Sequence, residues 1–499
     1  MKNKKDILAF LEREGLVVEH RICEDADIKG ITFDSKEVDK DHLFFCKGVA
    51  FKEIYLDEAL KRGASLYISE NRYEKSSDFI LVSDVRRAMV LLAAFYYDYP
   101  DKKLKTIGVT GTKGKSTTVI LIKSILDAYL EKKNMKACGL ISTIYNYVGD
   151  TDLKSSNSTP EALILYKLLH TAVENGLEYM VIECSSQALK YDRVNEVEFD
   201  MAVFLNIGED HVSPGEHPSF EDYFSSKLRI FDHARYALIN KSTDHLEEVL
   251  SKIEELNLPF ESFSASEEAD YMALDHYYDK GLLKFRASHA DMKEEFSLKL
   301  LGAYNVENAL ATMAVGQHFG LDLASIRQGL KKTEIKEREE ILTTPDGKIT
   351  AVVSYAHNGL SFEKSYEFIK EAFPDHFISS FFGIGGEKAD NRMVGMCQQA
   401  VKNSDFIYIV PDDPGYKTFE ENMERMLPYI EGKGVPYLGI DSRQEAIEEE
   451  FSKAFKRDKK TVLFIAGKGP EAYQKIMGKY IPIPTDAEVV KGILEKYDK

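Results

Sequence analysis

The stretch Thr110-Gly111-Thr112-Lys113-Gly114-Lys115-Ser116-Thr117 decides the fold of this chain. The apolar run 107–109 before it predicts a buried strand, and apolar positions after it recur at the spacing of a helix. A glycine turn between a strand and a helix presents backbone N–H groups and the positive end of the helix to a phosphate group. Lys115 can reach the terminal phosphates of a nucleotide, and the Ser116 hydroxyl can ligate magnesium. We therefore predict a nucleoside triphosphate loop rather than a structural turn with an incidental lysine.

The composition is that of a folded protein with several domains. The 499 residues exceed what one hydrophobic core usually organises, and 44% are hydrophobic and 30% charged. The net charge of -18 argues against nucleic acid or an anionic membrane as a partner, and an anionic substrate needs a local basic pocket. Five scattered cysteines without a Cys-x-x-Cys pair indicate neither a disulfide framework nor a zinc cluster. With no apolar signal core or membrane-spanning stretch, we expect a cytoplasmic protein without membrane insertion.

Alternating strand and helix patterns predict an α/β fold of three domains. We expect a small N-terminal α/β domain over residues 1–100, a central phosphate-loop domain over 101–333 and a C-terminal Rossmann-like α/β domain over 334–499. The central domain should hold a largely parallel sheet with helices on both faces, and ligands bind such sheets at the carboxyl ends of the strands. In the C-terminal domain, Gly383-Ile384-Gly385 lacks the third glycine of a dinucleotide fingerprint.

Two polar side chains follow strands of the predicted central sheet. Glu183 ends the apolar strand 179–182, and His211 follows the apolar strand 202–205. Because the carboxyl ends of parallel strands share one edge of the sheet, we expect both side chains beside the phosphate loop, where they can serve magnesium. Lys227 lies in a helical pattern with an aromatic face, and these residues alone predict that its ammonium reaches into water.

Other polar residues have roles that the pattern leaves open. Asn305 and Asn308 stand near a helix start, where an amide can hydrogen-bond a base edge or cap the helix. The turn Asp34-Ser35-Lys36 could hold the phosphate or ribose of a ligand, although its residues favour a surface turn.

The order of these motifs along nearly the whole chain resembles that of the Mur ligases. The resemblance includes the turn Asp34-Ser35-Lys36 and is closest to the tripeptide synthetases, which add the third amino acid. The other matching stretches are 110–116, Asn157-Ser158-Thr159-Pro160-Glu161, Glu183-Cys184-Ser185-Ser186, Asp210-His211, Lys227, Asn305-Val306-Glu307-Asn308-Ala309, Tyr355-Ala356-His357 and Ala466-Gly467-Lys468-Gly469.

The resemblance implies an ATP-dependent amide ligase of peptidoglycan precursor synthesis. In such a ligase, ATP phosphorylates the free carboxylate of UDP-N-acetylmuramoyl-L-alanyl-D-glutamate to an acyl phosphate. The amine of a free amino acid then attacks, and phosphate leaves from a tetrahedral intermediate. Magnesium and lysine neutralise charge on the transferring phosphoryl group. We expect the enzyme to be a monomer.

The resemblance also implies roles for individual residues. Lys115, Glu183, His211 and Lys227 match catalytic positions, and Lys227 would carry a carbamate. The magnesium positions are Ser116, Glu183, His211 and Lys227. The ATP positions are Gly111, Thr112, Lys113, Gly114, Lys115, Ser116, Thr117, Asn305, Asn308 and Arg338. The positions for the UDP-muramoyl peptide are Ser35, Ser158, Thr159, Ser185 and Arg193. The positions for the incoming amino acid are Arg392, which would hold its α-carboxylate, Asp412, Asp413, Gly467 and Glu471.

The identity of the added amino acid depends on one loop of the C-terminal domain. Asp412-Asp413-Pro414-Gly415 stands where diaminopimelate-adding members carry Asp-Asn-Pro-Arg. The arginine that would pair with the distal carboxylate of diaminopimelate is therefore missing. An acidic pocket of Asp412, Asp413 and Glu471 suits a side-chain ammonium, so we predict L-lysine, followed by ornithine and then meso-diaminopimelate.

Four positions depart from the family pattern and keep alternatives open. Gln187 replaces a histidine, Glu337 a glycine, Ser354 an aspartate and Pro470 a histidine, so a paralogue with another amino acid or acceptor is one alternative. A ligase like folylpolyglutamate synthetase would share the loop and the modified lysine, but not an N-terminal UDP-binding module. A non-ligase protein switched by ATP would not require the second magnesium site.

Overall fold

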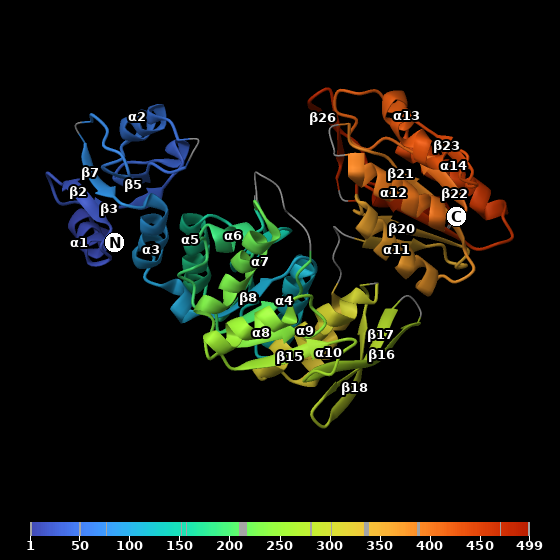
Figure 1. Ribbon diagram of the computed structural model, residues 1–499, viewed down its shortest axis with the longest axis horizontal. Coiled ribbons are helices and arrows are strands. Elements are labelled where there is room, and N and C mark those ends of the chain that lie inside the picture. Colours follow the sequence, from blue (N-terminus) through green and yellow to red (C-terminus); the bar gives the residue numbers. More distant parts are fainter. Residues whose placement is uncertain are drawn as a thin grey trace. The chain divides into compact units, whose positions relative to one another are not determined.

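The computed structural model describes residues 2–497 except 49–50, 76, 151, 156, 209–216, 280–281, 301, 334–338, 387–389 and 470. The chain divides into two compact units, whose helices and strands are labelled in Figure 1. Unit 1 comprises Met1–Asp275, Phe285–Phe296 and Val306–Lys332, and unit 2 comprises His276–Lys284, Ser297–Asn305 and Thr333–Lys499. The expected α/β class is confirmed, since the three large sheets fall one in each predicted region. The domain borders at residues 100 and 333 stay a prediction.

The N-terminal region holds a five-stranded sheet in the order β2-β7-β6-β5-β4, parallel except for the pair β2 and β7. Its strands are β2 (Val17–Arg21), β4 (Gly30–Thr32), β5 (His42–Phe45), β6 (Leu66–Ser69) and β7 (Asp78–Val82), and a separate pair joins β1 (Lys2–Asn3) to β3 (Asp27–Ile28). Its helices are α1 (Lys4–Arg13), η1 (Ser35–Glu37), α2 (Glu53–Arg62) and α3 (Val85–Tyr96). Asn3 and Asp6 form a capping box that fixes the start of α1.

The central sheet has the order β11-β10-β9-β12-β8-β13-β14-β15-β16-β17-β18. The strands from β9 to β16 in this order pair in parallel, so their carboxyl ends share one edge. Their bounds are β8 (Lys105–Thr110), β9 (Gly139–Ile141), β10 (Tyr145–Tyr147), β11 (Asp152–Lys154), β12 (Tyr179–Glu183), β13 (Met201–Phe204), β14 (Ala237–Asn240), β15 (Phe260–Ser264), β16 (Tyr271–Asp279), β17 (Leu282–His289) and β18 (Met292–Leu298).

Helices accompany this sheet in the strand-then-helix order that the sequence predicts. The short helix η2 (Pro100–Lys103) precedes β8. The other helices are α4 (Lys115–Lys132), α5 (Ala162–Glu174), α6 (Ser186–Lys190), α7 (Phe220–Leu228), η3 (Arg229–His233), α8 (Leu246–Glu255), α9 (Tyr304–His318) and α10 (Leu323–Lys332). β8 lies between β12 and β13, which places the glycine loop in the middle of the parallel edge.

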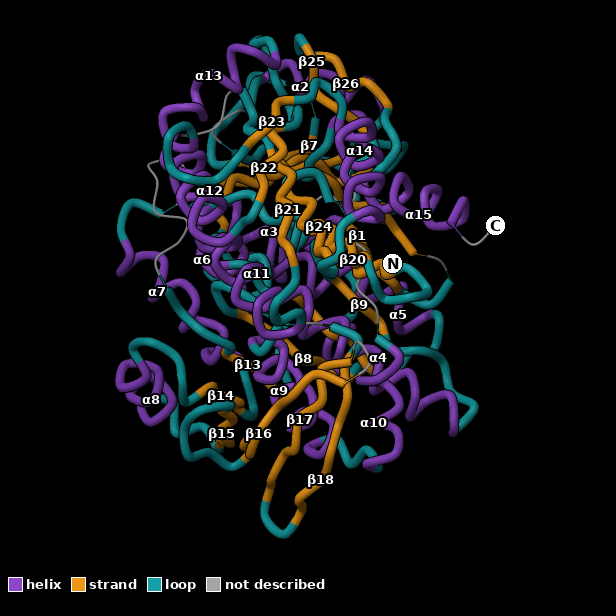
Figure 2. Tube along the Cα trace, turned by 90° about the vertical axis from the view of Figure 1, so that its right-hand side faces the viewer, coloured by secondary structure: helices purple, strands orange, loops and turns teal. Residues whose placement is uncertain are grey.

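The C-terminal region holds a six-stranded sheet in the order β19-β20-β24-β21-β22-β23, parallel except for the pair β19 and β20. Figure 2 shows α11, α12 and α13 on one face and α14 and α15 on the other. The strands are β19 (Glu339–Thr343), β20 (Ile349–Ser354), β21 (Phe377–Phe382), β22 (Phe406–Ile409), β23 (Tyr437–Gly439) and β24 (Thr461–Ala466), followed by the hairpin β25 (Tyr473–Ile476) and β26 (Lys479–Pro482). The helices are α11 (Gly359–Ala372), α12 (Asp390–Asn403), α13 (Phe419–Ile430), α14 (Arg443–Lys456) and α15 (Asp486–Tyr497).

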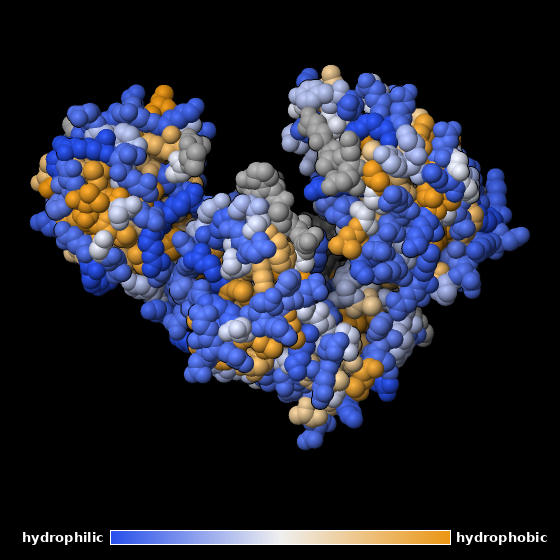
Figure 3. Space-filling model, viewed as in Figure 1, coloured by the Kyte–Doolittle hydropathy of each residue, from blue (hydrophilic) through white to orange (hydrophobic). Residues whose placement is uncertain are grey.

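The surface on the face drawn in Figure 3 is mainly hydrophilic, with apolar side chains scattered over it. None of the helices that the structure describes combines the length and the apolar character needed to cross a lipid bilayer.

Asp101, in the helix η2, is a buried acid with an incomplete set of hydrogen bonds. Its Oδ2 accepts a hydrogen bond from the Glu198 N–H at 3.4 Å, whereas its Oδ1 has no partner. Burial raises the pKa of this carboxyl above its ordinary value, and the Glu198 contact offsets the effect only in part. As pH rises, the unfolded chain therefore loses its proton first, and the free energy of unfolding falls until the folded carboxyl also ionises.

Replacing Asp101 with asparagine is expected to stabilise the protein at neutral pH. The amide removes a buried charge and keeps an acceptor for Glu198, so the free energy of unfolding should rise by about 1 kcal/mol at pH 7. The gain should shrink as pH falls below the ordinary pKa of aspartate, where both states of the wild type are protonated. Denaturant unfolding of Asp101→Asn at pH 7 and at a pH below the ordinary pKa of aspartate measures this gain, with the exposed Asp291→Asn as control. A variant less stable than the wild type at pH 7 would contradict the prediction.

Candidate active site

The loop between β8 and α4 is shaped by a glycine that no other residue could replace without strain. Gly114 precedes the first residue of α4 with a φ of 84°, in the left-handed region that favours glycine. A Cβ atom at this position would also lie only 2.5 Å from Oδ1 of Asn308 on α9. The Asn308 amide oxygen accepts a hydrogen bond from Thr118 Oγ1 at 3.2 Å. The structure thus brings Asn308, predicted as an ATP position, against the loop.

Two lysine ammonium groups meet at this loop. Nζ of Lys115 and Nζ of Lys227 each donate a hydrogen bond of 2.8 Å to the carbonyl oxygen of Gly111, and Lys115 also donates to the Thr112 carbonyl at 3.1 Å. Lys227 is only 1% exposed, and its ammonium lies 4.7 Å from the centre of the Tyr223 ring. Two adjacent positive charges favour a bound anion such as a phosphate group.

The expectation that the Lys227 ammonium reaches into water is therefore wrong. The helix α7 buries Lys227 together with Tyr223, Phe224 and Ser226, and the Lys227 ammonium donates to a backbone carbonyl instead of to solvent. Tyr223, one turn earlier, donates a hydrogen bond from its hydroxyl to Thr112 Oγ1 at 3.0 Å, which fastens the helix to the glycine loop.

Glu183 and Ser116 form an oxygen pair beneath the loop. Ser116 Oγ donates to Glu183 Oε1 at 2.9 Å, and the Thr143 N–H donates to Glu183 Oε2 at the same distance. Glu183 is the last residue of β12, and it is 2% exposed. A hydroxyl and a carboxylate are the oxygen ligands that magnesium prefers, so these two residues fit that ion. Among the described residues, no group of three or more His, Cys, Asp or Glu side chains is arranged to hold a metal.

Four of the five residues predicted for the UDP-muramoyl peptide lie together beyond β12. Thr159 Oγ1 donates to the Glu183 carbonyl at 2.7 Å and accepts from the Ser185 N–H at 3.0 Å. Ser158 Oγ accepts from Thr143 Oγ1 at 2.8 Å. Arg193 donates to the Thr159 carbonyl at 3.1 Å. These contacts gather the four polar side chains around the end of β12.

Other predicted residues include Ser35, Asn305, His211 and Arg338. Ser35, the fifth of that set, lies in the N-terminal sheet region, where its hydroxyl donates to Glu58 at 2.7 Å. Asn305 is buried in the first turn of α9. Four residues lie outside the part of the chain that the structure describes: His211, Arg338, and two of the positions that differ from the family pattern, Glu337 and Pro470.

A buried hydrogen-bonded chain next to the loop was not predicted. Nε2 of the fully buried His217 lies 3.0 Å from Ser186 Oγ, and its Nδ1 lies 2.6 Å from Asp222 Oδ2. Lys190 also pairs with Asp222 at 2.6 Å. The hydrogen bond from Lys190, and to a smaller extent that from His217, holds the pKa of Asp222 below its ordinary value. The chain joins α6, after Glu183, to α7, which carries Lys227. A single histidine in a loop pattern gave no sequence signal for it.

In unit 2, two residues of the predicted acidic pocket pair with a lysine in the loop after β24. The ammonium of Lys468, 1% exposed, pairs with Asp413 Oδ1 at 2.8 Å and with Glu471 Oε2 at 2.6 Å. Burial alone would lower the pKa of Lys468, but these two carboxylates outweigh burial and raise it. Asp413 and Glu471 thus hold an ammonium of the protein itself.

The loops after β22 and β24 are joined by one buried arginine. Arg443, at the start of α14, pairs with Asp486 at 2.6 Å and donates to the carbonyl oxygens of Pro411 at 3.3 Å and Ala466 at 2.9 Å. Each carbonyl directly precedes a residue predicted to bind the amino acid, Asp412 and Gly467 respectively. Arg443 therefore fixes the spacing of these two residues.

Replacing Arg443 with methionine is expected to cost about 3–5 kcal/mol of folding free energy, because Asp486 is left buried and unpaired. The double variant Arg443→Met/Asp486→Asn removes that charge and should recover part of the stability. If Arg443 positions the two loops, the double variant should still bind the amino acid more weakly than the wild type. Denaturant unfolding and KM for the amino acid separate the two effects; a double variant with wild-type KM would exclude the positioning role.

A pocket lies beside these loops in unit 2. Its lining combines two arginines, a histidine and a carboxylate with glycine backbone: His357, Gly383, Ile384, Gly385, Arg392, Met393, Met396, Asp412 and Arg425. His357 Nδ1 lies 2.8 Å from the carbonyl oxygen of Tyr355, which can only accept, so Nδ1 carries a proton. The structure thus brings Arg392 and Asp412, predicted separately for the amino acid, into one pocket.

The fold and this arrangement define an α/β protein built around a glycine loop at the parallel edge of its central sheet. Two family descriptions match the chain, the Mur ligase middle domain over residues 109–316 and the Mur ligase glutamate ligase domain over 337–469. The UDP-N-acetylmuramoyl-L-alanyl-D-glutamate–L-lysine ligase of Enterococcus faecalis is 34% identical over 504 residues, covering 99% of this chain and 97% of that protein. The chain belongs to the Mur ligase family, and it is a ligase.

Two further comparisons agree with this assignment. The L-lysine ligase of Streptococcus pyogenes is 33% identical over 467 residues, covering 93% of this chain and 92% of that protein. A solved UDP-N-acetylmuramoyl-L-alanyl-D-glutamate–2,6-diaminopimelate ligase shares the fold with a TM-score of 0.73 and 24% identity, and it covers 98% of this chain and 99% of the solved chain.

Proposed function

We propose that this ligase uses ATP to join L-lysine to UDP-N-acetylmuramoyl-L-alanyl-D-glutamate. The γ-phosphoryl group of ATP passes to the free carboxylate of the dipeptide, giving an acyl phosphate and ADP. The amine of lysine attacks the acyl carbon, the tetrahedral intermediate expels phosphate, and the amine nitrogen loses a proton. The product is the tripeptide of a peptidoglycan precursor.

The observation that carries this proposal is the cluster at the edge of the central sheet, in a chain that matches lysine ligases over almost its full length. Lys115 and Lys227 supply two positive charges at Gly111, where the phosphates of ATP would lie. Thr159, Ser185 and Arg193 lie around the end of β12, beside Glu183, where the dipeptide would lie. Positive groups fixed at the transferring phosphoryl group lower the barrier to its transfer.

Ser116 and Glu183 would hold a magnesium ion. When bound, the ion neutralises charge on the phosphates and orients them. The buried position of Glu183 and its hydrogen bond from Thr143 keep the carboxylate oriented without the ion. The roles of His211 as a ligand of a second ion, of Arg338 at ATP and of a carbamate on Lys227 rest on the family resemblance.

L-Lysine is supported by the named relatives more than by the acidic pocket. Asp413 and Glu471 hold Lys468, so Asp412 is the carboxylate of the predicted set that lines the pocket with Arg392. Gly415 stands where an arginine would pair with a second carboxylate, and the ligases of E. faecalis and S. pyogenes are named for L-lysine.

The test is phosphate release with ATP, magnesium and UDP-N-acetylmuramoyl-L-alanyl-D-glutamate, offering L-lysine, L-ornithine and meso-diaminopimelate in parallel, with the product mass determined. We expect turnover with lysine and the mass of the lysine tripeptide. Turnover with only diaminopimelate would overturn the choice of amino acid and keep the ligase. ATP hydrolysis that needs neither dipeptide nor amino acid would favour an ATP-switched protein instead.

A further inference from the structure

The pocket in unit 2 contains a second arginine that the sequence did not single out. Arg425, on α13, lines the pocket together with Arg392 on α12 and Asp412 after β22. Two guanidinium groups and one carboxylate thus share this lining, in a protein whose net charge is -18. Such a local basic site is what an anionic group needs in order to approach an acidic protein.

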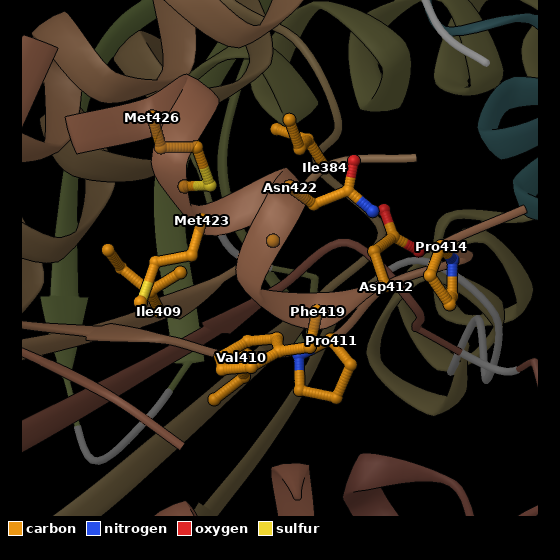
Figure 4. A pocket seen from close by; sticks show the side chains of 11 residues that line it. Ile384, Ile409, Val410, Pro411, Asp412, Pro414, Phe419, Asn422, Met423 and Met426 are labelled. Atoms are coloured by element: carbon orange, nitrogen blue, oxygen red, sulfur yellow. The ribbon is translucent and has the colours of Figure 1, made fainter. Parts of the chain in front are cut away.

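The Arg425 guanidinium is held in position by a buried amide. Its Nη1 donates to Asn422 Oδ1 at 3.1 Å, one turn earlier on α13, and Asn422 is 5% exposed. Figure 4 shows the Asn422 side chain in a neighbouring cavity, with its amide nitrogen directed towards the Asp412 carboxylate. This nitrogen is buried and has no hydrogen-bond partner among the described residues, whereas the amide oxygen accepts from Arg425.

We propose that Arg425 binds the α-carboxylate of the incoming amino acid together with Arg392. This inference rests on the proposed function, because L-lysine brings a single carboxylate, and that carboxylate has to be shared by both arginines of the pocket. A carboxylate has two oxygens that can accept from two guanidinium groups at once, and such charge-assisted hydrogen bonds are short and strong.

Binding of the α-carboxylate by both arginines has a consequence for the reaction. Two arginines on different helices fix both the position and the plane of the carboxylate, and thereby the direction of the adjacent α-amine that attacks. Asp412, on the same lining, repels a second carboxylate and attracts a side-chain ammonium. Arg425 thus takes part in selecting an amino acid with one carboxylate.

The experiment tests each enzyme variant with two amines, L-lysine and L-lysinamide. L-Lysinamide keeps the α-amine and the side chain of lysine but lacks the α-carboxylate. Initial rates of tripeptide formation are measured for the wild type, Arg425→Gln and Arg425→Lys, with either amine varied at saturating ATP, magnesium and dipeptide. Thermal melting checks that each variant is folded.

We expect Arg425→Gln to raise KM for L-lysine about 10-fold to 100-fold, as for a lost charge-assisted hydrogen bond, with a smaller change in kcat. The same change should alter kcat/KM for L-lysinamide less than about threefold, because that substrate has no carboxylate to lose. Arg425→Lys keeps the positive charge but not the two-pronged donor geometry of a guanidinium group. Its KM for L-lysine should therefore lie between those of the wild type and Arg425→Gln.

Equal losses with both amines would assign Arg425 a structural role and overturn the inference, as would a wild-type KM for L-lysine in Arg425→Gln. Failure of the proposed function is recognised separately, because the wild type would then form no lysine tripeptide. In that case, calorimetric binding of L-lysine and L-lysinamide to the same three proteins gives the same comparison without turnover.

Discussion

Replacing Glu183 with glutamine is expected to reduce tripeptide formation roughly 100-fold to 1,000-fold, the range found when a group that stabilises the transition-state charge is removed. Glutamine has the shape of glutamate and can still accept from the Thr143 N–H, so the end of β12 should keep its conformation. What is lost is the negative charge beside Ser116, and with it the affinity of this oxygen pair for magnesium.

Initial rates at several magnesium concentrations measure this prediction, and thermal melting confirms the fold. The matched control is Glu178→Gln, at the opposite end of β12, where the carboxylate pairs with Lys105 at 2.6 Å and faces the surface. We expect that control to keep wild-type activity. A Glu183→Gln enzyme with more than about a tenth of the wild-type rate at saturating magnesium would argue against a metal role.

Replacing Lys227 with methionine is expected to reduce kcat by about 1,000-fold or more while the protein stays folded. Methionine fills the space of the lysine stem, and removing a buried ammonium leaves no unpaired charge behind. The lost group lies at the Gly111 carbonyl beside Lys115. There an ammonium would balance charge on the transferring phosphoryl group directly, whereas a carbamate would do so by holding a magnesium ion.

The variant Lys227→Arg distinguishes a role of the positive charge from a role of the carbamate. It keeps a positive charge but cannot form a stable carbamate, so it should be nearly as inactive as Lys227→Met if the lysine is modified. Lys252→Met, which removes a lysine paired with Asp232 at 2.9 Å on α8, serves as the control. Mass spectrometry of the intact wild type in bicarbonate buffer tests the modification itself. Wild-type activity in Lys227→Met would remove this residue from the reaction.

The predictable part of the active site is the part that follows from strands and loops. Glu183 and the glycine loop lie on neighbouring parallel strands, and the period of apolar residues reveals both strands. Once the sheet is parallel, its carboxyl edge brings Lys115, Ser116 and Glu183 together without further information. For the same reason Ser185, two residues after β12, lies near them.

Side chains on helices were harder to place, because a helix can turn either face inward. The burial of Lys227 depends on how α7 packs against the glycine loop, and the buried contacts of His217 join α6 to α7 through Asp222. Neither contact leaves a periodic signal in the sequence. Arg425 was overlooked for the same reason, since an arginine on an amphipathic helix ordinarily faces water.

The sequence by itself determined the fold class, the family and the position of the phosphate loop, because these depend on local patterns of apolar residues and glycines. Only the tertiary structure decided which charges are already paired. Lys468 pairs with both Asp413 and Glu471, and Arg425 joins Arg392 at the pocket, because the charge balance of a site depends on side chains that the fold brings together from different loops and helices.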